Sequence, residues 1–487
     1  MRMILSRYSA MAVLLAGTAL VAACAPVPQL GARPEPRAAQ SIASATSLAS
    51  EQGNWPATDW WSAYGDPQLS ALIAEGLASA PDLAAAAARL RKAAAYADQA
   101  GAAQLPSLVA EAAGGWDKQS YNNGIPAQFV PRGWNDGGRA ALNLSFDPDL
   151  WGRNRAATAA ATSEAEAAAI ELAQARLVLS TNIAAAYTDL ARLHAERDVL
   201  ESALAVRSKT FRLVSNRYAT GLDTQAEVKQ AESAVPAARA DLAANEEAIA
   251  LTRNRIAALL GAGPDRGLAI TRPVAQSLQP HLLPADATTD LIGRRPDIAA
   301  ARARVEAAAS RIKVARADFY PAINLSALIG VQSLGLDNLF DSGSAIGSVR
   351  PAITLPIFQG GALRAQYKGA RADYDAAVAG YDQIVVQAYN EVADAVTSRR
   401  MLAVRLADSA EALSAAEQAH SVAQMRYEGG LSTFLDVLTA EDRVLQARRA
   451  VATLQTRAFT LDVALVRALG GGLTAANQNM SKDETHG

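Results

Sequence analysis

Two long stretches of the chain carry apolar residues at every seventh position. In the first half these residues are Leu172, Leu179, Ala186, Leu193 and Leu200, with a neighbouring stripe of Ile183, Leu190 and Leu204. In the second half they are Val378, Val385, Val392, Leu406 and Leu413, in a series interrupted by Arg399. A seven-residue repeat is typical of long helices that pack side by side as in a coiled coil. The pattern therefore predicts two sets of laterally packed helices.

These stretches also contain few of the residues that break helices. No Gly or Pro occurs from Arg153 to Thr220, and no Pro follows Ile357. If Arg155–Arg217 forms a single helix, it rises about 95 Å at roughly 1.5 Å per residue. A compact domain has no room for such a helix, so we expect it to lie along others of similar length.

Four shorter segments alternate between apolar and polar residues, as strands do. We predict strands at about 107–115 and 139–151 in the first half, and at 323–332 and 347–358 in the second. Such segments are typical of outer-membrane strands, although two small soluble hairpins that cap the helices are an alternative. Because an open sheet edge cannot face lipid, membrane strands would require oligomerisation. Three copies would supply twelve strands, enough for a closed barrel with a lumen.

The chain also repeats itself. Three pairs of similar segments occur in the same order in both halves: Ala80–Leu90 with Arg295–Val305, Pro106 with Pro321, and Arg217–Leu222 with Arg426–Leu431. One such pair is easily a coincidence, whereas three in order indicate an internal duplication. We predict repeats at 56–275 and 276–475, followed by a polar tail at 476–487.

The first residues have the composition of an export signal. A basic start precedes the apolar run Ala10–Ala23, which at about 14 residues is too short to span a bilayer. Cys24, the one cysteine of the chain, ends this run in a sequence that resembles a lipobox. We predict a signal peptide at 1–23 and a covalent lipid on Cys24; an ordinary signal peptide with an incidental cysteine is the alternative. Residues 24–55, rich in Pro, Ala, Ser and Gln, are predicted to form a flexible tether.

Composition removes several classes of function. The formal net charge is −2, without a basic stripe, so nothing favours nucleic acid as a partner. A single cysteine excludes a disulfide within the chain, and the four histidines are scattered. We find no nucleophile–base set, metal cluster or phosphate loop, and therefore expect neither an enzyme nor a cofactor other than the lipid on Cys24.

Four segments resemble the hallmark sequences of outer-membrane efflux proteins of the TolC and OprM kind: WWSAYGDPQLSALIAEGL (Trp60–Leu77), FDPDLWGRNRAA (Phe146–Ala157), LPIFQGGALRA (Leu355–Ala365) and RYEGGLSTFLDVLTAE (Arg426–Glu441). With the lipid on Cys24, they point to the NodT branch of the family. The resemblance implies a mainly α fold with a membrane β-barrel. Its homotrimer would form a twelve-stranded barrel in the Gram-negative outer membrane and a helical tunnel in the periplasm.

The resemblance also implies a function. The trimer would be a passive duct that exports drugs or other small solutes from an inner-membrane pump, usually of the resistance–nodulation–division type, through a periplasmic adaptor. The cargo is not written in this chain, because the pump selects it. A lipoprotein coiled-coil scaffold without a channel is the alternative, but the paired strands and the duplication favour the duct.

Two Arg-Tyr pairs precede a glycine where a long helix is expected to end, and they define the predicted hairpin tips: Arg217, Tyr218 and Gly221, and Arg426, Tyr427 and Gly430. We predict that an adaptor docks at these tips. Glu227 and Asp436 follow at equivalent positions and are the candidate residues of a periplasmic gate. Three copies around an axis would place them in an acidic, cation-attracting ring. The alternative is a pair of ordinary helix-start acids. In the best-known member of the family this motif carries a second Asp three residues on, where Thr439 stands here. The resemblance therefore implies a gate with a weaker charge in this chain.

Two further turns are expected where a strand passes into a long helix. They contain Trp151 and Gly152 in the first half, and Phe358, Gly360 and Gly361 in the second. Glycine permits a sharp turn, and an exposed aromatic side chain suits the membrane–water interface. We predict a structural role for both turns.

Overall fold

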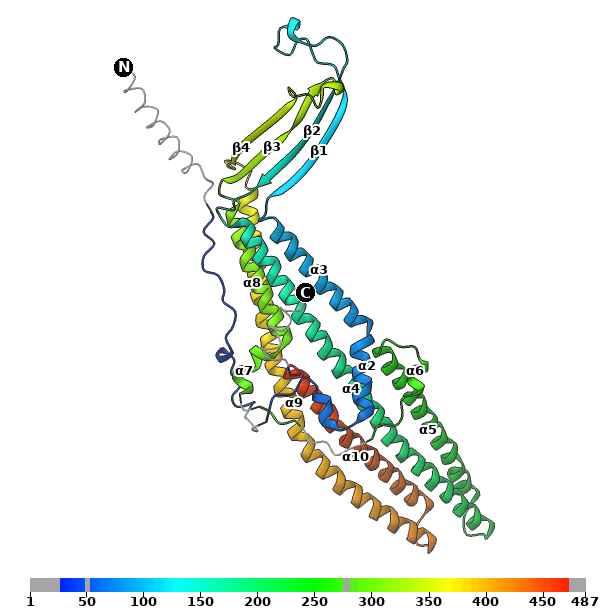
Figure 1. Ribbon diagram of the computed structural model, residues 1–487. Helices are drawn as coiled ribbons and strands as arrows, with labels where there is room; N and C mark the ends of the chain where they lie inside the picture. The colour runs from blue at the N-terminus through cyan, green and yellow to red at the C-terminus, as the bar shows by residue number, and fades with distance from the viewer. Residues whose placement is uncertain (1–26, 49–52, 275–280, 285, 473–487) are drawn as a thin grey trace. The chain divides into compact units, whose positions relative to one another are not determined.

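The computed structural model describes residues 27–48, 53–274, 281–284 and 286–472 (Figure 1). Cys24, the predicted signal peptide at 1–23 and the predicted tail at 476–487 lie outside the described residues. The chain divides into two units. The sheet unit contains residues 27–36, Leu90–Ala167 and Ala301–Tyr381, and the hairpin unit contains Arg37–Arg89, Ala168–Ala300 and the chain from Asp382 onward.

The sheet unit holds four antiparallel strands in chain order (Figure 1): β1 (Ser107–Asp117), β2 (Asn135–Phe146), β3 (Ala322–Leu334) and β4 (Ala345–Thr354). All four overlap the predicted strands. β2 and β4 end earlier than expected, because Pro148 and Pro356 follow them and proline has no N–H for the ladder. Pro351 lies within β4, where an edge strand tolerates it.

The register of the sheet gives it one apolar face. Leu142 pairs with Ile329, and Ala327 lies between Leu144 and Val349. Since neighbouring residues of a strand point to opposite faces, these apolar side chains share one face. The other face is mixed: it carries Arg139, Asn143, Ser326 and Arg350 together with Leu328 and Ile346.

Helices of equal length occur in the two halves of the chain. α3 (Pro81–Ala102) and α8 (Pro296–Ala317) have 22 residues each, and α4 (Arg153–Ala219) and α9 (Ala362–Glu428) have 67 each. The prediction of one unbroken helix from Arg155 to Arg217 is confirmed. In the sheet unit these helices bury mainly alanines, which permit close packing: Ala156, Ala160, Ala167, Ala303, Ala307, Ala308 and Ala315.

The hairpin unit contains the long helical hairpins. α4 is followed by α5 (Gln225–Leu259), and α9 by α10 (Phe434–Ala468), each of these second helices having 35 residues. Most of the seven-residue stripe of α4 is buried, as predicted, and α2 (Pro67–Ser79) belongs to the same apolar core. A Cβ added at Gly76 of α2 would lie 2.6 Å from the Ile183 side chain, so glycine allows this close contact.

Six short elements complete the described chain: η1 (Ala39–Ser41), η2 (Trp60–Tyr64), η3 (Ala127–Phe129), α6 (Asp265–Leu268), α7 (Ala287–Arg294) and η4 (Leu336–Asn338). None of the described helices is by itself long and apolar enough to cross a membrane. α2 and α3 reach that length and composition only when taken together, across a bend of 42°.

Part of the expected N-terminal tether is held against α9. The Tyr374 hydroxyl donates to the carbonyl of Pro34 at 3.0 Å, and Arg371 donates to the carbonyls of Gly31 and Ala32. Farther along, the Arg37 N–H donates to Asp382 at 2.9 Å. A flexible tether was expected from composition, but most of these bonds use backbone groups, which composition does not reveal.

Candidate functional site at the hairpin tips

Each hairpin turns at a left-handed glycine. Gly221 has φ +79° and Gly430 has φ +73°. The Leu222 N–H donates to the Arg217 carbonyl at 2.8 Å, and the Leu431 N–H donates to that of Arg426 at 2.7 Å. These bonds satisfy carbonyls that the helix end leaves free. A Cβ at either glycine would meet nothing within 4 Å, so the positive φ, rather than lack of space, favours glycine here.

The next helix of each hairpin begins with a capping box. The Thr224 N–H donates to the Glu227 carboxylate at 2.6 Å, and the Thr433 N–H donates to that of Asp436 at 3.0 Å. Both predicted gate residues therefore have a partner within their own helix start. This capping role is the one that the alternative interpretation gives them. An acidic ring stays a prediction.

A noncovalent cross-link, formed by the side chains of Arg217, Asp223 and Tyr427, joins the two tips. The Arg217 Nε donates to Asp223 at 3.1 Å, and the Tyr427 hydroxyl donates to the same carboxylate oxygen. The Arg217 guanidinium also lies 4.6 Å from the centroid of the Tyr427 ring and donates to the Glu428 carbonyl at 3.3 Å. Since Arg217 and Asp223 belong to the first hairpin and Tyr427 to the second, this cluster fastens one hairpin to the other.

Burial sets the electrostatics of the cross-link. Tyr427 is 2% exposed, and burial followed by the Asp223 carboxylate raises the pKa of its hydroxyl. Burial, the largest influence, would by itself lower the pKa of Arg217, but the hydrogen bond and the charge of Asp223, together with Tyr427, outweigh it and raise this pKa. The hydroxyl therefore remains a donor and the guanidinium a cation at any physiological pH.

An apolar cluster lies among the same helices. Val214, Ala231, Tyr427, Phe434 and Val437 form a buried group to which all four hairpin helices contribute. Such a group excludes water from the neighbouring ion pair and strengthens it.

A second ion pair also joins the hairpins. The Arg207 Nε of α4 lies 3.3 Å from the buried Glu441 carboxylate of α10, and its Nη2 lies 3.0 Å from Asp442. Burial raises the pKa of Glu441, and Arg207 only partly offsets this effect. Sequence reasoning singled out neither Asp223 nor Glu441. The sequence does contain one indication of Asp223, because Ser432 stands at its place in the second copy of the motif.

The predicted strand-to-helix turns are also present. Gly152, Gly360 and Gly361 all have positive φ. Trp151 stacks on Tyr320 with ring centroids 5.0 Å apart, and its indole donates to the Pro321 carbonyl at 2.7 Å. Phe358 is exposed. These contacts give Trp151 a structural partner in the sheet unit.

The described residues contain no group of three or more His, Cys, Asp or Glu that could hold a metal ion. The sequence model of the outer membrane efflux protein family matches this chain twice, at residues 72–262 and 288–471. The chain belongs to the outer membrane efflux protein family. This membership confirms the resemblance noted in the sequence. The protein is an outer-membrane efflux channel rather than an enzyme.

Three relatives show how far the similarity to this efflux family extends. The fusaric acid resistance protein FusA of Burkholderia cepacia is 39% identical over 68% of this chain and 62% of its own length. The multidrug resistance outer membrane protein MdtP of Escherichia coli is 31% identical over 95% of this chain and 96% of its own. The crystal structure of VceC from Vibrio cholerae has a TM-score of 0.81 at 46% identity, covering 86% of this chain and all of that one.

Proposed function

We propose that three copies of this chain form one passive duct, with their sheets closed into a twelve-stranded barrel in the outer membrane. The exposed apolar face of the sheet carries this proposal. Leu108, Ile329, Val349 and Ile353 lie on that face and are 64–73% exposed in the single chain. A soluble sheet would cover such a face, whereas lipid is a suitable neighbour for it.

The edges of the sheet support a closed oligomer. Within the described residues, β1 and β4 each have one neighbouring strand. Their outer N–H and C=O groups would find no partner in lipid. Pairing β1 of one copy with β4 of the next satisfies these groups, and three such junctions close the sheet without an edge.

Aromatic residues at both ends of the sheet agree with a membrane position. Trp116 and Trp134 lie at one end, Trp151 and Phe358 at the other, and all four are exposed. The 11 residues of β1 rise about 36 Å, which at a tilt of about 45° spans roughly 25 Å. This is the height of the apolar band expected between two aromatic girdles.

The equal helix lengths and the two successive matches to the family model support an internal duplication, with repeats at 56–275 and 276–475. Each copy would then contribute two similar hairpins to a tunnel in the periplasm. A helix of 67 residues rises about 100 Å at roughly 1.5 Å per residue, as a tunnel wall requires.

The hairpin tips would be the gate and the docking surface. In the closed duct, the cross-link among Arg217, Asp223 and Tyr427 holds the two hairpins of one copy together, while Gly221 and Gly430 shape the turns that meet a periplasmic adaptor. Gly430→Val should strain its turn and reduce the yield of chemical cross-linking to an adaptor at an unchanged trimer level. Loss of the trimer itself would instead assign Gly430 to the fold.

Two remaining parts of the proposal concern anchoring and cargo. A lipid on Cys24 would anchor each copy; labelled palmitate should enter the wild type and not Cys24→Ser. The names of FusA and MdtP support small organic antimicrobial compounds as cargo, delivered by an inner-membrane pump, which we infer to be of the resistance–nodulation–division type. Co-purification with a tagged copy would identify that pump.

The full-length protein tests the duct directly. We expect a heat-sensitive trimer on gels and discrete single-channel currents in planar bilayers. A stable trimer without currents would favour the alternative, a lipoprotein scaffold. A monomer that inserts into membranes would contradict the shared barrel.

A further inference from the structure

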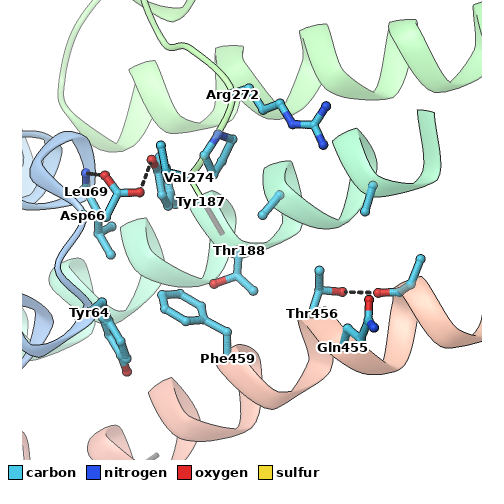
Figure 2. Close-up of a pocket in the computed structure, with 14 residues that line it drawn as sticks. Tyr64, Asp66, Leu69, Tyr187, Thr188, Arg272, Val274, Gln455, Thr456 and Phe459 are labelled. Carbon is cyan, nitrogen blue, oxygen red and sulfur yellow. Dashed lines mark hydrogen bonds between the residues drawn. The ribbon is translucent and has the colours of Figure 1, made fainter. Parts of the chain in front are cut away.

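A cavity of about 490 Å³ lies in the hairpin unit between α4 and α10 (Figure 2). Its other walls come from η2, the start of α2 and residues 272–274. Figure 2 shows Tyr64, Asp66 and Phe459 toward one end, and Arg272, Gln455 and Thr456 toward the other. The volume is within the range of small-molecule sites, roughly 300–1,000 Å³.

One end of the cavity is aromatic. Tyr64 and Phe459 contact each other with ring centroids 4.3 Å apart, and Tyr187 lines the opposite wall. Both tyrosine hydroxyls already have acceptors: Tyr64 donates to Asp462 at 2.6 Å, and Tyr187 donates to Asp66 at 2.7 Å. The ring surfaces, rather than the hydroxyls, are therefore what this end offers to a ligand.

The same end holds a carboxylate without a counter-charge. Asp66 is 5% exposed, and its partners are the neutral Tyr187 hydroxyl and the N–H groups of Gln68 and Leu69. No Lys, Arg or His of the described chain forms an ion pair with it. The positive end of α2 offsets part of this charge. A buried charge with neutral partners still favours an added cation.

The other end does not favour an anion. Arg272 is the one cation among the described lining residues, and both of its Nη atoms bind the Asp198 carboxylate, at 2.9 and 2.6 Å. Its charge is thus already matched, whereas that of Asp66 is not. The electrostatic preference of the cavity is therefore for a positive ligand.

We propose that this cavity binds an aromatic organic cation, with its ammonium group beside Asp66 and against the rings of Tyr64, Tyr187 and Phe459. Aromatic faces attract quaternary ammonium groups, and the effect is largest where water is excluded. The bound cation would contact α4 of the first repeat and α10 of the second. The proposal concerns the single chain, so it holds whether or not three copies form a duct.

Two probes of similar shape and opposite charge test the preference. Benzyltrimethylammonium and benzylsulfonate are titrated into the purified full-length protein by calorimetry. We expect one site per chain for the cation and none for the anion. Equal binding of both probes, or binding of neither, would overturn the proposal.

Asp66→Asn is the decisive variant. Asparagine retains the cap of α2 while removing the charge, so the fold should persist. We expect the affinity for benzyltrimethylammonium to fall roughly tenfold or more. Glu75→Gln is the matched control, because it removes a carboxylate from the same helix that pairs with Arg266 instead. The control should bind the cation as the wild type does.

Two more variants locate the site. Ala195→Trp fills the cavity from α4 and should abolish binding at an unchanged thermal midpoint. Asp436→Ala should leave binding intact, because the proposed acidic ring at the tips is a separate cation site. Binding that survives Asp66→Asn and disappears in Asp436→Ala would overturn the cavity proposal and support the ring.

Discussion

The two hairpin tips have nearly the same sequence, yet their tyrosines occupy opposite environments. Tyr427 is 2% exposed, whereas the equivalent Tyr218 is 47% exposed. Both tips use a left-handed glycine and a capping box. From Arg217 to Thr224 the first tip differs from the second at three positions, with Ala219, Thr220 and Asp223 in place of Glu428, Gly429 and Ser432. Of these, Asp223 supplies the carboxylate that accepts from the Tyr427 hydroxyl. A repeated motif can thus reproduce a turn twice while a few substitutions, Asp223 for Ser432 among them, confine the electrostatic contact to one carboxylate.

Removing Asp223 should have the largest effect. Asp223→Ala leaves the largely buried Arg217 without its carboxylate and Tyr427 without an acceptor. We expect a local loss of about 2–3 kcal/mol, because an uncompensated buried charge is costly. Amide hydrogen exchange at both tips should then accelerate by roughly 30- to 150-fold.

Ser432→Ala is the matched control for Asp223→Ala. The Ser432 hydroxyl makes one long bond, 3.4 Å, to the Ala423 carbonyl. Its removal should leave tip exchange near the wild-type rate. Equal acceleration in the two variants would mean that the tips are held together by shape alone.

The tyrosine hydroxyls should show the same asymmetry on a smaller scale. Tyr427→Phe removes one donor to Asp223, while Arg217 still neutralises that carboxylate, so we expect a loss of about 1 kcal/mol. Tyr218→Phe alters an exposed side chain and should change nothing measurable. Amide exchange at the tips about fivefold faster in Tyr427→Phe and unchanged in Tyr218→Phe would confirm that one tyrosine hydroxyl stabilises the tips and the other does not. The same exchange rate in both variants would contradict this asymmetry.

Much of the fold follows from local pattern. The seven-residue stripes, with no Gly or Pro in α4 and no Pro in α9, predict the long helix of each hairpin, and alternation predicts the four strands. The ends of the strands are predicted less accurately than the strands themselves. Phe146 ends β2 because Pro148 follows, although the apolar pattern continues to Trp151.

The candidate site was only partly predictable. Glycine and the capping residues act within a few positions of one another, so the turns were visible in sequence. The contact between Asp223 and Tyr427 joins residues 204 positions apart, and no local pattern specifies it. Glu441 ends a recognised motif, but its burial against Arg207 depends on how the two hairpins pack.

The second ion pair between the hairpins should respond to pH. Because burial raises the pKa of Glu441, the folded chain binds this proton more tightly than the unfolded chain does. The preference of the folded chain for protonated Glu441 therefore contributes its full stabilisation below the ordinary value of 4.5, and this stabilisation is lost as pH rises through the folded pKa. Thermal melting of the helices should show this decline in the wild type and not in Glu441→Gln. Glu417→Gln, which removes an exposed carboxylate paired with Arg448, should retain it.

Substitutions of Glu227 and Asp436, the acidic residues at the two helix starts, should affect the two tips almost equally. Their effect on stability should be the smallest of those considered. Asp436→Ala or Glu227→Ala removes half of a capping box, at a cost of about 1 kcal/mol to that helix start. If three copies bring these carboxylates to one axis, each variant should also lower cation selectivity in single-channel currents, most clearly at low salt, where screening is least. The double variant should then exceed either single one, since both residues would line one constriction. Asp436→Asn separates the two roles, because it keeps an acceptor for the Thr433 N–H while removing the charge. A double variant with unchanged selectivity would leave both residues as helix caps.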